Sequence, residues 1–123
     1  MGRNREKHLY GDEKCYVVLD INPVTEGHML VITKSHYDNM LGVPKEELSS
    51  LFSIAQDFAK LAIEKLGAKG VNVGTNIGKS AGQEIMHVHV HVIPRYTSRY
   101  SKRHNLTADE EARLLKLLKK GSV

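Results

Sequence analysis

The sequence His87-Val88-His89-Val90-His91-Val92-Ile93 alternates imidazole and aliphatic side chains along one short stretch of the chain. In a β-strand successive side chains point to opposite faces, so the three histidines would share one face and the valines the other. We expect a strand over residues 86–93, ended by Pro94, with the valines packed on a hydrophobic core. Three imidazoles are costly to bury without polar partners, and their face is therefore the candidate functional surface.

The segments before this strand predict a small antiparallel sheet. Apolar residues at 9–10, 16–19 and 28–33 are separated by turns that are too short for helical crossovers. A further strand is expected at 71–76, followed by a glycine-containing loop at 78–82.

Two segments carry helical signals. Between residues 44 and 66 the apolar period becomes three and four residues, which predicts one long amphipathic helix. Pro44 suits its first position and Gly67 its exit. Thr107-Ala108-Asp109-Glu110 fits a capping box and predicts a C-terminal helix. Strands with one long helix between them indicate an α+β fold.

Length and composition limit the class of protein. The 123 residues, 41% hydrophobic and 26% charged, indicate one globular domain over residues 1–123. No apolar run approaches the ~20 residues that cross a bilayer, and we find no secretory signal. Cys15 is the single cysteine and cannot form an internal disulfide. We expect a cytoplasmic protein without a membrane partner.

The net charge of +4 equals the charge of one acid-free stretch, residues 95–104, whose basic residues are Arg95, Arg99, Lys102 and Arg103. Tyr96 and Tyr100 stand between these charges, so the stretch could contact nucleic acid through phosphates and base stacking. The simpler interpretation is a solvated loop that attracts small anions such as a phosphate ester. We favour the second interpretation and do not expect nucleic acid as a partner.

A metal site is one interpretation of the histidine face. At ~3.3 Å rise per residue, neighbouring histidines on one face stand ~6.6 Å apart and the outer pair ~13 Å apart. A regular strand therefore offers two convenient zinc ligands. A metal would need further ligands such as His28 or Glu84.

Nucleophilic catalysis is the other interpretation, and it accounts for all three histidines. A neutral imidazole with a free nitrogen lone pair can attack phosphorus and split one difficult displacement into two easier ones. A flanking imidazole can donate to a phosphate oxygen. The loop at 78–82 lets backbone N–H groups approach an anion. We prefer this interpretation.

These residues resemble the histidine triad (HIT) superfamily of nucleotide hydrolases and transferases. The resemblance covers residues 7–95 in the right order and leaves 96–123 as a basic loop and a C-terminal helix. Beside the histidine strand it rests on several short matches: Leu19-Asp20-Ile21-Asn22-Pro23, Gly27-His28, Lys34-Ser35-His36, Asn76, Ala81-Gly82-Gln83 and Pro94-Arg95. It implies about five antiparallel strands with the long helix, paired into a homodimer with a continuous sheet.

The resemblance also implies catalytic roles. His89 would attack the α-phosphorus of a purine nucleotide and form a nucleotidyl-imidazole intermediate, from which water releases a nucleoside monophosphate. His91 would bond to a phosphate oxygen. His87 would support the site by hydrogen bonds, and His28 would lie close beneath it.

Substrate contacts are implied in the same way. Asn76 and Gln83 would hold the phosphate and the bridging oxygen, with Gly82 in the loop beside them. Asp20 would accept hydrogen bonds from the ribose hydroxyls, and Ile21 would lie against the base.

Two departures from the family pattern affect these expectations. Many members hold zinc through an N-terminal Cys-x-x-Cys, which this chain lacks, so we expect no metal, no cofactor and no metal role for His36 or His87. Glu84 follows Gln83 where many members have Ser or Thr. A hydroxyl can donate to a leaving group, whereas an ionised carboxylate only accepts.

The preferred leaving group therefore stays open. The substrate is a nucleoside phosphoramidate or acyl-nucleotide on one side, or a dinucleoside polyphosphate on the other. The rival function is a non-catalytic module that binds a nucleotide or a metal with the same histidine face.

Overall fold

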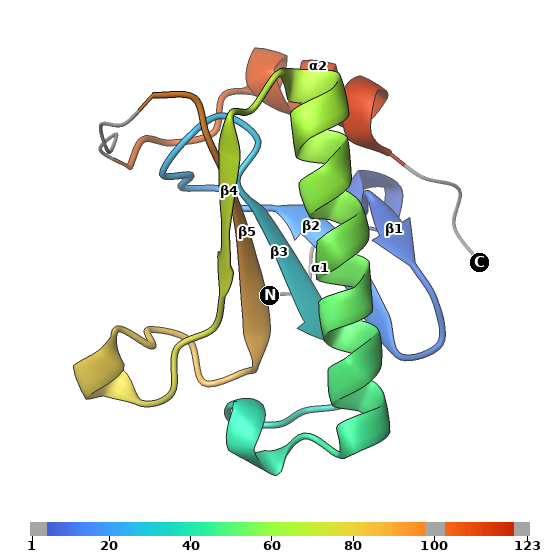
Figure 1. The fold of residues 1–123 in the computed structure, drawn as a ribbon, viewed down its shortest axis with the longest axis vertical. Helices are drawn as coiled ribbons and strands as arrows, with labels where there is room; N and C mark the ends of the chain where they lie inside the picture. The colour runs from blue at the N-terminus through green and yellow to red at the C-terminus, as the bar shows by residue number, and fades with distance from the viewer. Residues whose placement is uncertain (1–4, 98–102, 120–123) are drawn as a thin grey trace.

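The computed structural model describes residues 5–97 and 103–119, and these form an antiparallel sheet with a long helix across one face (Figure 1). The strand order is β1-β2-β3-β5-β4, and every neighbouring pair is antiparallel. The strands are β1 (Tyr10–Gly11), β2 (Cys15–Leu19), β3 (Met29–Thr33), β4 (Gly70–Gly74) and β5 (His89–Arg95). The helices are α1 (Lys45–Leu66) and α2 (Ala108–Leu118), with short 3-10 turns at Arg5–Lys7, Met40–Gly42 and Lys79–Ala81. The expected α+β fold with five antiparallel strands, a long helix and a C-terminal helix is confirmed.

β5 lies between β3 and β4 and divides the two faces of the sheet. Its valines are fully buried under α1, in the same core as Phe58 and Leu51 of that helix. His89 and His91 lie on the opposite face, where they pair in register with Ile32 and Leu30 of β3. The predicted alternation therefore holds from residue 89 onward.

Both ends of β5 differ from the expectation of a strand over 86–93. His87 precedes the strand, because the Val88 N–H donates to the Tyr37 carbonyl instead of to a neighbouring strand. Pro94 lies within the strand, where it pairs with Val71 of β4. Pairing of β5 with β3 ends at Val92, before Pro94. The Thr25 hydroxyl donates to the Pro94 carbonyl in place of a strand partner. No strand hydrogen bond is therefore lost because proline has no N–H.

Helix α1 follows its apolar period. Its buried residues face β3, β4 and β5: Leu51, Ile54, Ala55, Phe58 and Ala62. Pro44 is the N-cap, one position before the first helical residue that we expected it to occupy. Gly67 ends the helix with φ +72°, a left-handed conformation that glycine adopts without strain.

The C-terminal helix closes the same core. Thr107 and Glu110 form the predicted capping box. Leu114 and Leu118 of α2 are buried with the residues that α1 covers. Immediately before this helix, residues 103–106 run beside the loop at 20–23, to which the N–H groups of His104 and Leu106 donate. We call residues 103–106 the strap.

No helix among residues 5–97 and 103–119 is both long enough and apolar enough to span a bilayer.

Phe58 carries a testable share of the stability, since its side chain is 1% exposed at the centre of the core. We predict that Phe58→Ala lowers the free energy of unfolding by about 3–5 kcal/mol. Ile63→Ala on the same helix removes a side chain that is 53% exposed, and the expected loss is below about 1 kcal/mol. Urea denaturation followed by circular dichroism measures both values. Equal losses would place the core elsewhere.

Candidate active site

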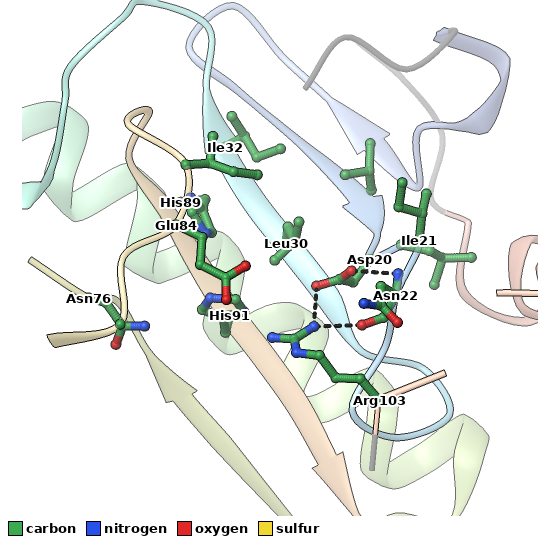
Figure 2. A pocket seen from close by; sticks show the side chains of 14 residues that line it. Asp20, Ile21, Asn22, Leu30, Ile32, Asn76, Glu84, His89, His91 and Arg103 are labelled. Atoms are coloured by element: carbon green, nitrogen blue, oxygen red, sulfur yellow. Dashed lines mark hydrogen bonds and ion pairs between the residues drawn. The ribbon is translucent and has the colours of Figure 1, made fainter. Parts of the chain in front are cut away.

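A cavity of about 630 Å³ opens on the sheet face opposite α1 (Figure 2). Its floor is apolar and consists of Val18 on β2 with Leu30 and Ile32 on β3. Its rim is polar and carries Asp20, Asn76, Glu84, His89, His91 and Arg103. An apolar floor with a few converging polar groups is typical of a site for a small organic anion.

His89 is fixed in one tautomer by the backbone. Its Nδ1 lies 2.7 Å from the carbonyl oxygen of His87. A carbonyl only accepts hydrogen bonds, so Nδ1 carries the proton and Nε2 keeps its lone pair in the neutral ring. The ring lines the cavity, and its Nε2 is therefore available there as a nucleophile or proton acceptor.

His91 has the opposite polarity because of His28 beneath it. The Val24 N–H donates to His28 Nδ1 at 3.0 Å, so the proton of the neutral His28 ring is on Nε2. This proton is donated to His91 Nδ1 at 2.9 Å. The proton of neutral His91 is then on Nε2, and His91 presents a donor to the cavity.

Burial keeps this histidine pair uncharged. Desolvation lowers the pKa of His28 from 6.5 to about 4, against the opposing influence of the Asp20 carboxylate. Desolvation, together with nearby His89, lowers the pKa of His91 to about 4 as well. Both rings are neutral at pH 7, so His91 can donate a hydrogen bond without carrying a charge.

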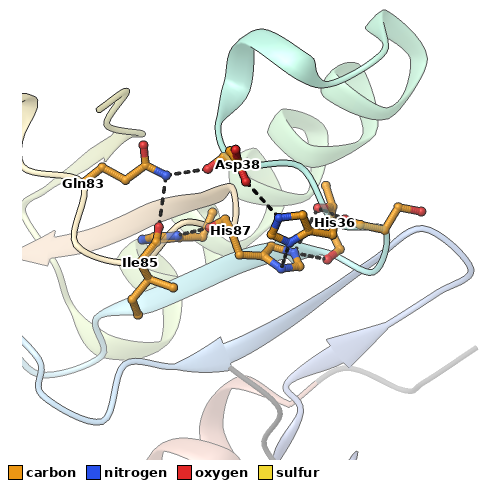
Figure 3. Close-up of polar contacts among 8 residues, drawn as sticks. His36, Asp38, Gln83, Ile85 and His87 are labelled. Carbon is orange, nitrogen blue, oxygen red and sulfur yellow. Dashed lines mark hydrogen bonds and ion pairs between the residues drawn. The ribbon is translucent and has the colours of Figure 1, made fainter. Parts of the chain in front are cut away.

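His87 does not line the cavity, unlike His89 and His91, although the sequence predicted three rings in a row. Its Nε2 lies 2.8 Å from the Thr33 carbonyl, to which it donates. Its Nδ1 lies 3.4 Å from Nδ1 of His36, whose own Nε2 is 2.9 Å from Asp38 (Figure 3). The His87 ring thus fixes the backbone carbonyl that orients His89.

Gln83 is 4% exposed and holds the loop rather than lining the cavity. Its Oε1 accepts from the Gly78 N–H at 2.8 Å. Its Nε2 donates to the carbonyls of Asp38 and Ile85 (Figure 3). A side-chain amide with these three bonds has little capacity left for a phosphate, which differs from the contact that the resemblance implies.

The expected phosphate loop reaches the cavity through Asn76 and Gly82. Gly82 has φ +93°, and a Cβ there would lie 3.4 Å from Asn76 Nδ2. That distance is an ordinary contact, so glycine is required here by its left-handed backbone conformation rather than by lack of space.

Asp20 and Ile21 lie at the other end of the cavity. Asp20 Oδ1 accepts from the Asn22 N–H at 2.8 Å, while Oδ2 lies 3.6 Å from His28 Nε2. Ile21 is 64% exposed, so its side chain is available to a flat apolar ligand.

Arg103 is the main lining residue that the sequence reasoning missed. Its Nη1 lies 3.4 Å from Asp20 Oδ2 and also donates to the Asn22 carbonyl. The strap holds it there, since the His104 and Leu106 N–H groups donate to the Pro23 and Ile21 carbonyls. The acid-free composition of residues 95–104 was the one signal for it. Arg99, Lys102 and Tyr100 of that stretch lie outside the described residues.

A metal would find three potential ligands in this site. Among the residues described, one such cluster occurs: ligand atoms of Asp20, His28 and His91 lie within 4.8 Å of one another. The hydrogen bond from His28 to His91 accounts for the close approach of those two rings. Glu84 lines the same cavity but is not in the cluster.

Known proteins show the same pattern in sequence. Residues 2–98 match the HIT domain family. The chain is 42% identical over 62 residues to an uncharacterised HIT-like protein of Mesomycoplasma hyorhinis, covering 50% of this chain and 56% of that protein. It is 34% identical over 65 residues to adenylylsulfatase HINT3 of Arabidopsis thaliana, covering 53% and 33%. The chain thus spans about half or less of the length of these curated relatives.

Solved structures agree over most of the chain. A hypothetical histidine triad nucleotide-binding protein of Sulfolobus tokodaii superposes with a TM-score of 0.86 at 33% identity, covering 92% of this chain and 80% of that one. A zinc-bound histidine triad family protein of Mycobacterium smegmatis gives 0.79 at 38% identity, covering 90% and 82%.

The neutral histidine pair predicts a specific pH dependence. Both folded-state pKa values lie below 6.5, so the unfolded chain binds more protons between pH 6.5 and 4. The free energy of unfolding should therefore fall as the pH drops through this window. His28→Gln should flatten the slope by up to about 1.4 kcal/mol per pH unit. Urea titrations at several pH values measure it, and an unchanged slope in the variant would contradict the assignment.

Proposed function

The chain belongs to the HIT domain family, and we propose that it is a nucleotide hydrolase or transferase that cleaves at the α-phosphorus of a purine nucleotide through His89. The observation that carries this proposal is the 2.7 Å hydrogen bond between His89 Nδ1 and the His87 carbonyl. With the proton on Nδ1, Nε2 of the neutral ring keeps a lone pair that can react with a ligand in the cavity. Adenylylsulfatase HINT3 shows that a relative is a hydrolase.

In the first step the Nε2 lone pair attacks phosphorus, and the leaving group departs with the electron pair of its bond to phosphorus. A phosphate or sulfate leaves as the anion, whereas an amine takes up a proton from solvent as it leaves. The imidazole becomes positively charged while it is bonded to phosphorus. The His87 carbonyl then accepts a stronger, charge-assisted hydrogen bond from Nδ1–H. His91 donates from Nε2 to a non-bridging phosphate oxygen, where negative charge accumulates.

In the second step water attacks the phosphorus of the nucleotidyl-imidazole. The electron pair of the P–N bond returns to Nε2, a proton passes to solvent, and a nucleoside monophosphate leaves. The covalent intermediate thus replaces one displacement by two that use the same ring.

Substrate binding follows the shape of the cavity. The Asp20 carboxylate suits the ribose hydroxyls, and the exposed side chain of Ile21 suits a purine base. Asn76 and the backbone at Gly82 suit the phosphate. We assign Gln83 the task of holding this loop in place through its three hydrogen bonds.

We further propose that two copies pair through β4. This strand is at one end of the sheet order, and within the described part of the chain its outer edge has no partner strand. Val73 on it is 43% exposed. A second β4 would satisfy the open edge and continue the sheet.

One observation favours the rival function of a metal-binding module, namely the cluster of Asp20, His28 and His91. The two proposals differ in what zinc does. For the hydrolase, chelation leaves turnover unchanged, whereas stoichiometric zinc and activity lost on chelation would favour the rival. A protein that binds a nucleoside monophosphate tightly but turns over no nucleotide would be a binding module.

The nucleophile can be identified directly. We predict that rapid quenching during turnover of an α-³²P-labelled adenosine phosphoramidate or dinucleoside polyphosphate leaves the label on His89. His89→Asn should lose activity by about a thousand-fold or more and keep its melting temperature, since the ring lies in an open cavity.

His8→Asn provides the matched control, because His8 lies outside the cavity and stacks on Tyr16. The His8→Asn variant should keep the activity of the unmodified protein. Label on another residue, or product formed without any adduct, would refute the proposed intermediate.

A further inference from the structure

A second hollow lies beside the main cavity, on the same face of the sheet over β4 and β5. Its volume is about 270 Å³, and its polar lining comes from Asn72, Thr75, Asn76, His91 and Arg103. Three of these residues also line the main cavity: Asn76, His91 and Arg103. A ligand that occupies both spaces would therefore pass beside His91.

The order of residues along β5 relates this hollow to the reaction. His89, His91 and Ile93 follow one another on the open face at ~6.6 Å spacing. His89 lines only the main cavity, Ile93 lines only the hollow, and His91 lines both. A group displaced in line from phosphorus moves away from the attacking His89, which is toward the hollow.

The charges of the two spaces differ. Asp20 and Glu84 both line the main cavity, whereas no carboxylate of the described residues lines the hollow. His91 is neutral there, because burial lowers its pKa to about 4. Arg103 lines both spaces and pairs with Asp20 on the side of the main cavity, so in the hollow its positive charge faces no carboxylate of the lining. Arg95 stands at the border of the hollow, with Nε donating to Asn72 at 2.7 Å.

Some hydrogen-bond donors of the Arg103 guanidinium are not used by the residues that the structure describes. Both of its hydrogen bonds, to Asp20 and to the Asn22 carbonyl, come from Nη1. Its Nε and Nη2 donate to none of the residues that the structure describes, and the side chain is 43% exposed. The strap fixes the backbone, so the guanidinium is anchored on the Asp20 side and open on the other (Figure 2). A planar guanidinium held this way suits an oxyanion.

We propose that the hollow is an anion subsite in which Arg103, with Asn76 in the same lining, binds the anionic group attached to the α-phosphorus. The substrates would then be nucleotides with a sulfate or phosphate leaving group rather than an amine. This inference rests on the proposed function for the position of the α-phosphorus. It makes Arg103 a specificity-determining residue.

Binding tests the subsite without any turnover. In a His89→Asn background we would titrate AMP and ADP by calorimetry, because ADP is AMP with one more anionic group in the leaving position. ADP should bind about ten-fold or more tightly than AMP, and Arg103→Gln should abolish this preference. Any effect of the variant on Asp20 and the ribose is common to both nucleotides and cancels in the comparison.

Arg113→Gln is the matched control. It removes an arginine of similar exposure that pairs with Glu26 and lines neither space. The preference for ADP should survive in this variant. A preference that is absent with Arg103 present, or that persists in Arg103→Gln, would overturn the subsite.

Kinetics separate this inference from the proposed function. With His89 intact, Arg103→Gln should lower kcat/KM for adenosine 5′-phosphosulfate by about ten- to a hundred-fold, and that for adenosine 5′-phosphoramidate by less than about three-fold. Equal losses would overturn the specificity role. An Arg103-dependent preference for ADP without turnover of either substrate would support the subsite and refute the proposed reaction.

Discussion

The register of β5 is the constraint on which the rest of the molecule depends. It is fixed on one side by β3, where Ile32 pairs with His89, and on the other by β4, where Gly74 pairs with His91. Because side chains alternate along a strand, a slip by one residue would move the imidazoles into the core and the valines into the cavity. The cost of burying two unpartnered imidazoles makes this alternative unfavourable. Packing under α1 and the position of the His89 ring are therefore specified by the same hydrogen-bond ladder.

The site assigns opposite roles to two identical side chains without using charge. His89 has its Nδ1 bound to a carbonyl and presents a lone pair, while His91 has its Nδ1 bound to the Nε2–H of His28 and presents a proton. The hydrogen-bond partner of Nδ1 decides whether each neutral ring presents a lone pair or a proton. Burial keeps the His28–His91 pair neutral. When His89 is neutral, an acceptor and a donor thus stand side by side.

Local pattern was sufficient for most of the fold. The alternation from His89 onward, the apolar period of α1, the left-handed Gly67 and the capping box at Thr107 each depend on neighbours within a few residues, and each was predicted. The start of β5 was not, because it depends on Tyr37 and Thr33, some fifty residues earlier in the chain. Its end was not, because it depends on pairing with Val71 and on the Thr25 hydroxyl.

The same distinction separates the site residues. The resemblance named most of the cavity, and the structure brings His89, His91, Asp20 and Asn76 to its rim with His28 beneath. It did not predict that the Gln83 amide is bonded to the Asp38 and Ile85 carbonyls and to the Gly78 N–H. Residue spacing also could not predict the contacts of Arg103 with Asp20 and Asn22, which lie more than eighty positions earlier in the chain.

The strap has a consequence for how this site can diverge. It is attached to the loop at 20–23 by main-chain hydrogen bonds from residues 104 and 106, which do not depend on the identity of the side chains. Replacement of the side chain at position 103 would therefore leave the sheet and His89 in place, while it would change the lining of the proposed anion subsite. Selection can retune substrate choice in this segment at little cost to folding, so the tail is a natural place for paralogues to differ.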